Sequence, residues 1–207
     1  MARGLFITVE GGEGAGKSTQ LRAIKDWLEA RGRQVVVTRE PGGTELGEKV
    51  RGVLLHQAGE ISADAEVLLM FAARAEHLAR VIRPALAAGK TVLCDRFTDA
   101  TYAYQGGGRG VPFDRIAAIE AWVQKELRPD ITLLLDVPVP VGLSRAAQRS
   151  TPDRFEREQD AFFERVRSAY LAAAAREPKR IHVIDAARSE SEVSRAVIAV
   201  LQELTHG

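Results

Sequence analysis

The feature of this sequence that most constrains its fold is a glycine-rich segment near the N-terminus. The residues from Gly11 to Ser18 read Gly-Gly-Glu-Gly-Ala-Gly-Lys-Ser and follow the apolar run Leu5–Val9. Glycines let the backbone wrap closely around phosphates, and a helix that begins here turns its unpaired amides and positive dipole end toward them. Lys17 would reach the β- and γ-phosphates, and Ser18 would hold Mg²⁺ through its hydroxyl. A strand, this loop and a helix in that order predict a nucleoside triphosphate site.

Short apolar runs alternate with longer segments of helical spacing. The runs are nearly continuous in apolar character, which is typical of parallel strands covered on both faces. They are Leu5–Val9, Gln34–Thr38, Thr91–Cys94, Ile131–Leu135 and Ile181–Ile184. The helical segments are Lys17–Arg31, Ser62–Arg83, Pro112–Leu127, Val139–Arg149, Glu158–Arg176 and Ser189–Leu204. We therefore predict a three-layer α/β fold in which helices flank a five-stranded parallel sheet.

Length and charge narrow the function further. A chain of 207 residues suits one domain over residues 1–207, and the composition shifts nowhere enough to indicate a boundary. The net charge of +1 argues against a general attraction to nucleic acid or membrane, and no apolar run reaches the ~20 residues that span a bilayer. Cys94 is the only cysteine, which indicates a reducing compartment. We expect a cytoplasmic protein.

Polar residues resume directly after each predicted strand. In open parallel sheets, ligands bind outside the carboxyl ends of the strands. Strand ends are also simply where polar residues resume, but five such cases on one rim favour a ligand site. These residues are Glu10, Arg39, Glu40, Asp95, Arg96, Asp136 and Asp185.

The phosphate loop alone is shared by regulatory switches, motors and small-molecule kinases. The D-x-x-G and N-K-x-D segments of GTP-dependent switches are both absent from the sequence, and a motor would usually be larger. A small chain with a second group of basic residues fits a kinase that has two substrate pockets. A nucleotide-dependent switch and a binding module without catalysis are the alternatives from other classes.

Several further motifs resemble the bacterial thymidylate kinases along essentially the whole chain. They are Thr38-Arg39-Glu40-Pro41-Gly42-Gly43-Thr44, Leu69-Met70-Phe71-Ala72-Ala73-Arg74, Asp95-Arg96-Phe97, Thr101-Tyr102-Ala103-Tyr104-Gln105-Gly106-Gly107 and Asp153-Arg154-Phe155. The resemblance implies a P-loop kinase fold, transfer of a phosphoryl group from ATP to dTMP with Mg²⁺, and a homodimer. Another pyrimidine nucleoside monophosphate kinase is the nearest alternative.

The resemblance also assigns the acceptor site. Phe71 and Arg74 share one face of a predicted helix, where Phe71 would stack on the base and Arg74 would donate to a base carbonyl. Core packing is the alternative for Phe71, and an ion pair with Glu40 or Asp95 is the alternative for Arg74. Tyr104 would crowd a ribose 2′-hydroxyl, unless it too is core. The predicted dTMP-binding residues are Glu13, Arg39, Glu40, Pro41, Phe71, Arg74, Arg96, Thr101, Tyr104 and Gln105.

The donor site and the catalytic groups complete the prediction. Gly14 occupies the loop position where one branch of the family has an arginine, whereas a basic lid at about residues 145–157 offers arginines here. We expect Arg149 and Arg154 to bridge the transferring group and Arg145 to pack on adenine. Metal binding is assigned to Ser18 and Asp95, and catalysis to Lys17, Asp95, Arg96, Arg149 and Arg154. The predicted ATP-binding residues are Gly11, Gly12, Glu13, Gly14, Ala15, Gly16, Lys17, Ser18, Thr19 and Arg145.

Overall fold

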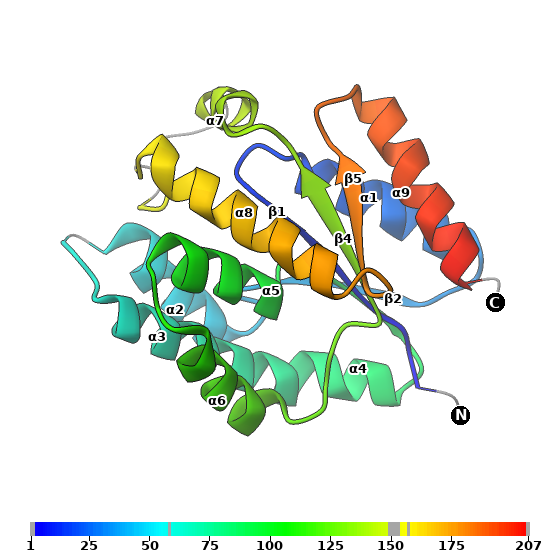
Figure 1. The fold of residues 1–207 in the computed structure, drawn as a ribbon. Coiled ribbons are helices and arrows are strands. Elements are labelled where there is room, and N and C mark those ends of the chain that lie inside the picture. Colours follow the sequence, from blue (N-terminus) through cyan, green and yellow to red (C-terminus); the bar gives the residue numbers. More distant parts are fainter. Residues whose placement is uncertain (1–2, 58, 149–153, 157, 206–207) are drawn as a thin grey trace.

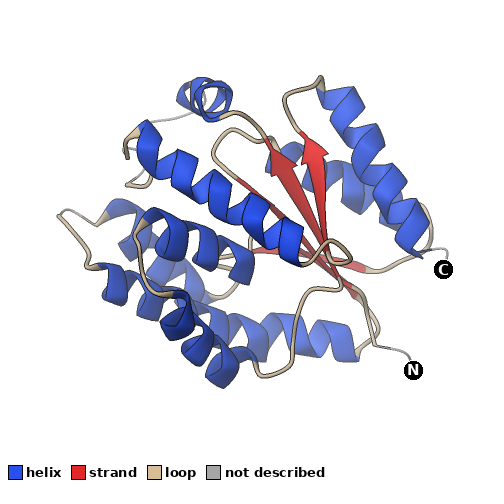
Figure 2. Cartoon of the chain, viewed as in Figure 1, coloured by secondary structure: helices blue, strands red, loops and turns tan. Residues whose placement is uncertain are grey.

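A computed structural model of the chain describes residues 3–57, 59–148, 154–156 and 158–205 (Figure 1). Its centre is a five-stranded, wholly parallel sheet, as the apolar runs predict, and its strand order is β2-β3-β1-β4-β5. Figure 2 shows the strands enclosed between helices, which gives the three predicted layers. The strands are β1 Phe6–Gly11, β2 Val35–Arg39, β3 Thr91–Asp95, β4 Ile131–Asp136 and β5 Ile181–Asp185.

The helices of the described part of the chain differ in number from those expected. Two unpredicted segments are helical: α2, whose N-cap Thr44 accepts a hydrogen bond from the Gly47 amide, and residues 98–108. The predicted helix Ser62–Arg83 is divided by a π-helical segment, Leu78–Ile82. The helices are α1 Lys17–Glu29, α2 Glu45–His56, α3 Ala63–His77, α4 Arg83–Ala87, α5 Thr98–Thr101, α6 Phe113–Gln124, α7 Val139–Ala147, α8 Asp160–Arg176 and α9 Glu190–Thr205.

Side chains alternate between the two faces of the sheet along each strand, and each face packs against different helices. On β1, Ile7 and Val9 belong to a core that contains α1 and α9, whereas Phe6 packs in a second core that includes α4. Leu134 of β4 joins a third core, which is formed largely by α8. No helix of the described residues is both long and apolar enough to cross a bilayer.

The register of the sheet brings the functional ends of three neighbouring strands together. Val9 of β1 and Arg39 of β2 both pair with Asp95 of β3. The phosphate loop and the segments that follow β2 and β3 therefore leave the sheet side by side. This is the rim on which the polar residues were expected to gather.

A π-helical segment, Tyr102–Gly108, continues α5 and packs against α8. Its glycines allow this approach: a Cβ at Gly107 would lie 2.7 Å from the Cβ of Ala169, and one at Gly108 would overlap the Phe162 ring. The polar stretch that contains Tyr104 and Gln105 is thus a packed helical wall of the site.

Candidate active site

The phosphate loop joins β1 to α1, and its backbone needs glycine. Gly11, Gly14 and Gly16 have φ angles of 141°, 66° and 86°. A Cβ at Gly14 would also overlap the carbonyl of Gly142 at α7, so this loop position has no room for an arginine side chain. The Lys17 ammonium group donates to the carbonyls of Gly11 (3.2 Å) and Gly12 (3.1 Å), which holds it along the loop.

The first turn of α1 carries the other predicted donor-site residues. No side chain caps this end of the helix, because the N-cap position is Gly16. The unpaired amides of the first turn therefore remain available to an anion. Ser18 is exposed and Thr19 half-buried in this turn, while Ala15 is buried within the loop.

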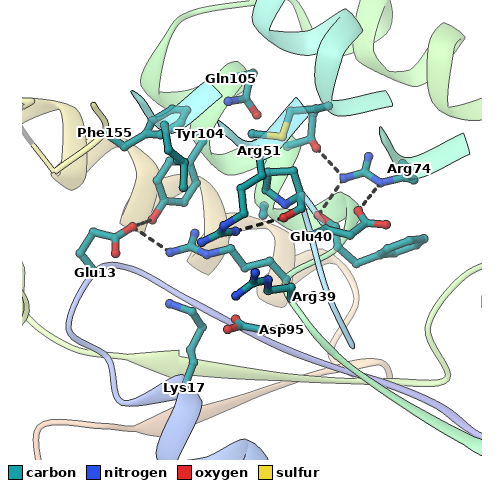
Figure 3. Close-up of a pocket in the computed structure, with 17 residues that line it drawn as sticks. Glu13, Lys17, Arg39, Glu40, Arg51, Arg74, Asp95, Tyr104, Gln105 and Phe155 are labelled. Atoms are coloured by element: carbon teal, nitrogen blue, oxygen red, sulfur yellow. Dashed lines mark hydrogen bonds and ion pairs between the residues drawn. The ribbon is translucent and has the colours of Figure 1, made fainter. Parts of the chain in front are cut away.

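A cavity of about 190 Å³ adjoins the loop at the rim of the sheet. Figure 3 shows Lys17 and Asp95 close together at one end and Gln105 at the other. Every residue predicted to bind dTMP lines this cavity, except Phe71. Its lining residues are Glu13, Lys17, Arg39, Glu40, Pro41, Arg51, Leu55, Met70, Arg74, Asp95, Arg96, Phe97, Ala100, Thr101, Tyr104, Gln105 and Phe155.

Arg74 is buried within this cavity wall and is only partly satisfied. Its Nε donates to Glu40 at 2.6 Å, and its Nη2 donates to the Phe97 carbonyl at 3.2 Å and to Thr101 Oγ1 at 2.9 Å. Its Nη1 is buried and has no hydrogen-bond partner among the described residues. The ion pair with Glu40 that spacing left open is therefore present, yet one strong donor still lacks an acceptor.

Phe71 lies elsewhere than expected. It packs in a core with Val67, Val111 and Ile116 and does not line the cavity, so it is not placed to stack on a bound base. The guanidinium carbon of Arg74 lies 4.7 Å from the centroid of its ring. The helical periodicity correctly placed Phe71 and Arg74 on one face of α3. The Phe71 ring, however, packs against the Arg74 guanidinium and does not line the cavity.

The residue before it, Met70, lines the cavity instead. Its side chain is half-buried and packs beside the core clusters of α2 and α8. Nothing in the spacing of apolar residues favours a thioether over an aromatic ring at this wall. Adjacent residues of a helix point in different directions, so only one of Met70 and Phe71 can face the cavity.

Arg96 follows β3 in a left-handed conformation, with φ 65°. Its Nη2 donates to Glu13 Oε1 at 2.8 Å, and the Tyr104 hydroxyl donates to the same oxygen at 2.8 Å. Burial by itself raises the pKa of Glu13, but Arg96 and Lys17 outweigh it and lower the pKa below its ordinary value. Glu13 therefore stays ionised, which explains how a carboxylate is tolerated in a phosphate loop.

Asp95 and Ser18 are the candidates for a metal. One oxygen of Asp95, Oδ1, is buried and has no hydrogen-bond partner in the described structure. Residues 3–57, 59–148, 154–156 and 158–205 contain no cluster of three acidic, histidine or cysteine side chains that would form a metal cage. One carboxylate and one hydroxyl fit Mg²⁺, which usually keeps waters and binds together with substrate phosphates.

Arg51 is a lining residue that sequence reasoning missed. It lies on α2, which was not predicted, and its Nη1 donates to the Pro41 carbonyl at 3.0 Å. Arg39 is held nearby by Glu48 at 2.8 Å. The capping pattern Thr44 to Gly47 and the apolar spacing of α2 could have found this helix. The lining contains five cations, Lys17, Arg39, Arg51, Arg74 and Arg96, against three carboxylates, Glu13, Glu40 and Asp95.

The predicted lid is only partly described. Arg149 lies outside the described residues. Arg154 is described but does not line the cavity, because it donates to Glu66 Oε2 at 2.5 Å and to the Leu54 carbonyl at 2.7 Å. Arg145 donates to the Ala186 carbonyl at 2.8 Å, beside the segment that follows β5. The structure thus brings Arg145, the residue expected to pack on adenine, to the segment after β5, but it does not bring Arg154 to the phosphate loop.

A phosphate loop on a five-stranded parallel sheet, with a cationic cavity beside it, defines a P-loop nucleotide kinase. The family model for thymidylate kinase matches residues 9–197. A thymidylate kinase of Pseudomonas putida (strain W619) is 62% identical over 198 residues, which cover 95% of this chain and 96% of that one. A second, from Pseudomonas syringae pv. tomato, is 60% identical over 97% of this chain and 96% of its own.

A solved structure agrees with these matches. The crystal structure of thymidylate kinase from Ehrlichia chaffeensis superimposes with a TM-score of 0.78 and 36% identity, and the match covers 96% of this chain and 99% of that chain. The chain belongs to the thymidylate kinase family.

Proposed function

We propose that the protein transfers the γ-phosphoryl group of ATP to dTMP, giving dTDP and ADP, as a step of dTTP biosynthesis. The observation that carries this proposal is the cavity beside the phosphate loop, whose five cations outnumber its three carboxylates and whose buried Arg74 keeps an unpaired donor. An acceptor that has a dianionic phosphate at one end and a carbonyl at the other satisfies both features.

The phosphate of the acceptor would lie near Arg39, Arg51 and Arg96. The planar guanidinium of Arg96 suits bidentate contact with phosphate oxygens, and Glu13 already fixes its orientation at 2.8 Å. Ser18 and Asp95 would hold Mg²⁺, which supplies positive charge between the donor phosphates when bound. The excess of cations would offset the charge of two phosphate groups brought close together.

The base would lie between Arg74, Met70 and Gln105. Arg74 Nη1 would donate to a base carbonyl, which satisfies a buried donor that has no hydrogen-bond partner among the described residues. The Tyr104 hydroxyl is fixed on Glu13, and its ring makes T-shaped contacts with Phe155, Phe162 and Tyr170. A ring held in this way cannot move aside for an added 2′-hydroxyl, which favours a deoxynucleotide.

The reaction would be a direct in-line transfer. An oxygen of the acceptor phosphate, already ionised at neutral pH, would attack the γ-phosphorus of ATP while the bond from that phosphorus to the bridging oxygen of ADP breaks. ADP leaves with the electron pair of that bond, so no general base is needed. Lys17 would stabilise the charge on the β- and γ-phosphates, and Arg96 would stabilise the charge on the acceptor. Arg149 remains our proposed lid residue for the transferring group, with Arg145 near the adenine.

The direct test is ADP release with ATP, Mg²⁺ and each of dTMP, dUMP, UMP, dCMP, AMP and GMP. We expect strong turnover with dTMP, weak turnover with ribonucleotides and none without an acceptor. Turnover with a different pyrimidine monophosphate would move the protein to the nearest alternative function. ATP binding with no acceptor-dependent turnover would contradict the kinase proposal.

A second test separates the two substrates. Arg74→Ala removes the unpaired donor and should raise the KM for dTMP by about 10²-fold, because hydrogen bonds to charged groups contribute roughly 1.5–3 kcal/mol. The KM for ATP should stay within about 2-fold, since Arg74 hydrogen-bonds to Glu40, Phe97 and Thr101 and to no described residue of the phosphate loop. Arg80→Ala, at an exposed arginine beyond the end of α3 that pairs with Glu76, is the matched control. An equal rise in both KM values would show that Arg74 is only structural.

We also infer that the protein forms a homodimer in the cytoplasm. Leu68 of α3 and Trp122 of α6 are 58% and 81% exposed, and these two helices pack against each other. Large exposed apolar side chains on adjacent helices are typical of an interface between proteins. The buried free thiol of Cys94 suits a reducing compartment. Leu68→Glu combined with Trp122→Glu should give a monomer by light scattering, whereas an unchanged mass would refute this interface.

A further inference from the structure

Glu66, a fully buried carboxylate in the first turn of α3, has no place in the transfer reaction described above. Three side chains donate to it: Gln105 Nε2 at 2.7 Å, Arg109 Nε at 3.5 Å and Arg154 Nη2 at 2.5 Å. A buried charge is costly unless it is paired and hydrogen-bonded. The concentration of donors on one carboxylate therefore fixes the relative positions of the segments that supply them.

These donors come from different segments of the chain, and only one of the three lines the acceptor site. Gln105 lines the cavity, whereas Arg154 belongs to the described end of the predicted lid, residues 154–156. Arg154 also donates to the carbonyl of Leu54 on α2 at 2.7 Å. Arg109 in turn forms a 2.5 Å ion pair with Glu158, just beyond the lid. We name Glu66, Gln105, Arg109 and Arg154 the Glu66 cluster.

Two arginines of the cluster pack against Phe155, which follows Arg154 directly and lines the acceptor cavity. The guanidinium carbons of Arg154 and Arg109 lie 4.6 Å and 5.6 Å from the centroid of its ring. Its edge meets Tyr104 at a centroid distance of 5.8 Å. One wall of the acceptor cavity is thus carried by the end of the lid and held in place through Glu66.

We propose that Glu66 is a positioning residue that anchors the end of the lid to the acceptor site through Arg154, so that Phe155 and Gln105 stand in the wall against which the acceptor binds. Arg154 is then an anchor of the lid and not a ligand of the transferring phosphoryl group, in contrast to the role that the sequence predicts for it. The kinetic part of this inference rests on the proposed function, whereas the structural part does not.

The kinetic experiment compares Glu66→Gln, Arg154→Met and the double variant. Each single variant should raise the KM for dTMP by about 10-fold, because breaking a buried ion pair leaves its partner uncompensated. The KM for ATP should change by less than about 2-fold, and the double variant should be no worse than either single one because the two residues act together. Glu76→Gln, at a part-exposed glutamate of α3 that pairs with Arg80, is the control.

Two kinetic outcomes would overturn the proposal. A fall in kcat in Arg154→Met with both KM values unchanged would place Arg154 on the transferring group. Parallel increases in both KM values, with a lowered melting temperature, would show that the cluster stabilises the fold in general and does not position the acceptor wall.

A proteolysis experiment tests the anchor without turnover. Trypsin cleaves after arginine, and the Arg154 side chain is mostly buried on Glu66 and Leu54. Cleavage after Arg154, followed by mass spectrometry, should be about 10-fold faster in Glu66→Gln than in Glu76→Gln, and dTMP should slow it in the wild type. Equal cleavage rates in the two variants would refute the anchor. If the anchor holds but another nucleotide protects, the cluster stands and the proposed acceptor fails.

Discussion

The two sides of the active site are built in different ways. The proposed donor side is a loop of contiguous residues that would bind phosphates mainly through backbone amides, and its shape follows from positive φ angles at Gly11, Gly14 and Gly16. The acceptor side is made of side chains from the ends of β2 and β3, from α2, α3 and α5, and from the π-helical segment Tyr102–Gly108. The first depends on local sequence, and the second depends on how distant segments pack.

The largest expected effect tests the donor side. Lys17→Met removes the ammonium group that lies against the Gly11 and Gly12 carbonyls. We expect kcat to fall by about 10²–10³-fold, which is typical when one charge-stabilising group is lost from a transition state. The dissociation constant of dTMP, measured by calorimetry, should change little. Lys25→Met, at an exposed lysine on α1, is the control. A large loss of dTMP affinity in Lys17→Met would show that the two sides are not separable.

The same contrast explains how much could be predicted. The loop, the parallel sheet and the polar residues on its rim follow from motif and periodicity, because glycine spacing and strand composition are local signals. Phe71 was misplaced and Arg51 was missed for a different reason. Whether a buried helix face turns toward a ligand or toward the core depends on the helices packed against it, here α6 beside Phe71. Arg51 lies on a helix whose first turn contains glycine, which weakens the helical signal.

The acceptor side is sharpened by comparing two adjacent residues of α3. Met70→Ala removes a side chain that lines the cavity, and we expect the KM for dTMP to rise by about 5–10-fold through lost contact with the base. Phe71→Leu shortens a core side chain below Arg74 and should mainly lower stability, by roughly 1–2 kcal/mol. Urea unfolding and steady-state kinetics on both variants distinguish the roles. The reverse result would restore the stacking role of Phe71.

The smallest expected effect concerns Glu10, a fully buried residue near the end of β1. It accepts hydrogen bonds from the Phe97 amide at 2.7 Å and from the Tyr170 hydroxyl at 2.8 Å, so it fixes the turn that presents Arg96. Burial, assisted by Asp99, raises the pKa of Glu10 from 4.5 to about 7. The folded state therefore binds this proton more tightly than the unfolded chain, and the free energy of unfolding falls as pH rises through about 7.

The free energy of unfolding should fall by about 1 kcal/mol between pH 6 and pH 7, because the pKa of Glu10 is raised to about 7 in the folded state. The glutamine of Glu10→Gln cannot titrate, so the free energy of unfolding of this variant should not show this decrease with pH. Urea titrations of both proteins at pH 6, 7 and 8 measure the difference, and Glu76→Gln should keep the wild-type slope. A wild-type slope in Glu10→Gln would mean that Glu10 is ionised throughout. The positive charge of Arg96 would then outweigh burial on this side of the site, as it already does at Glu13.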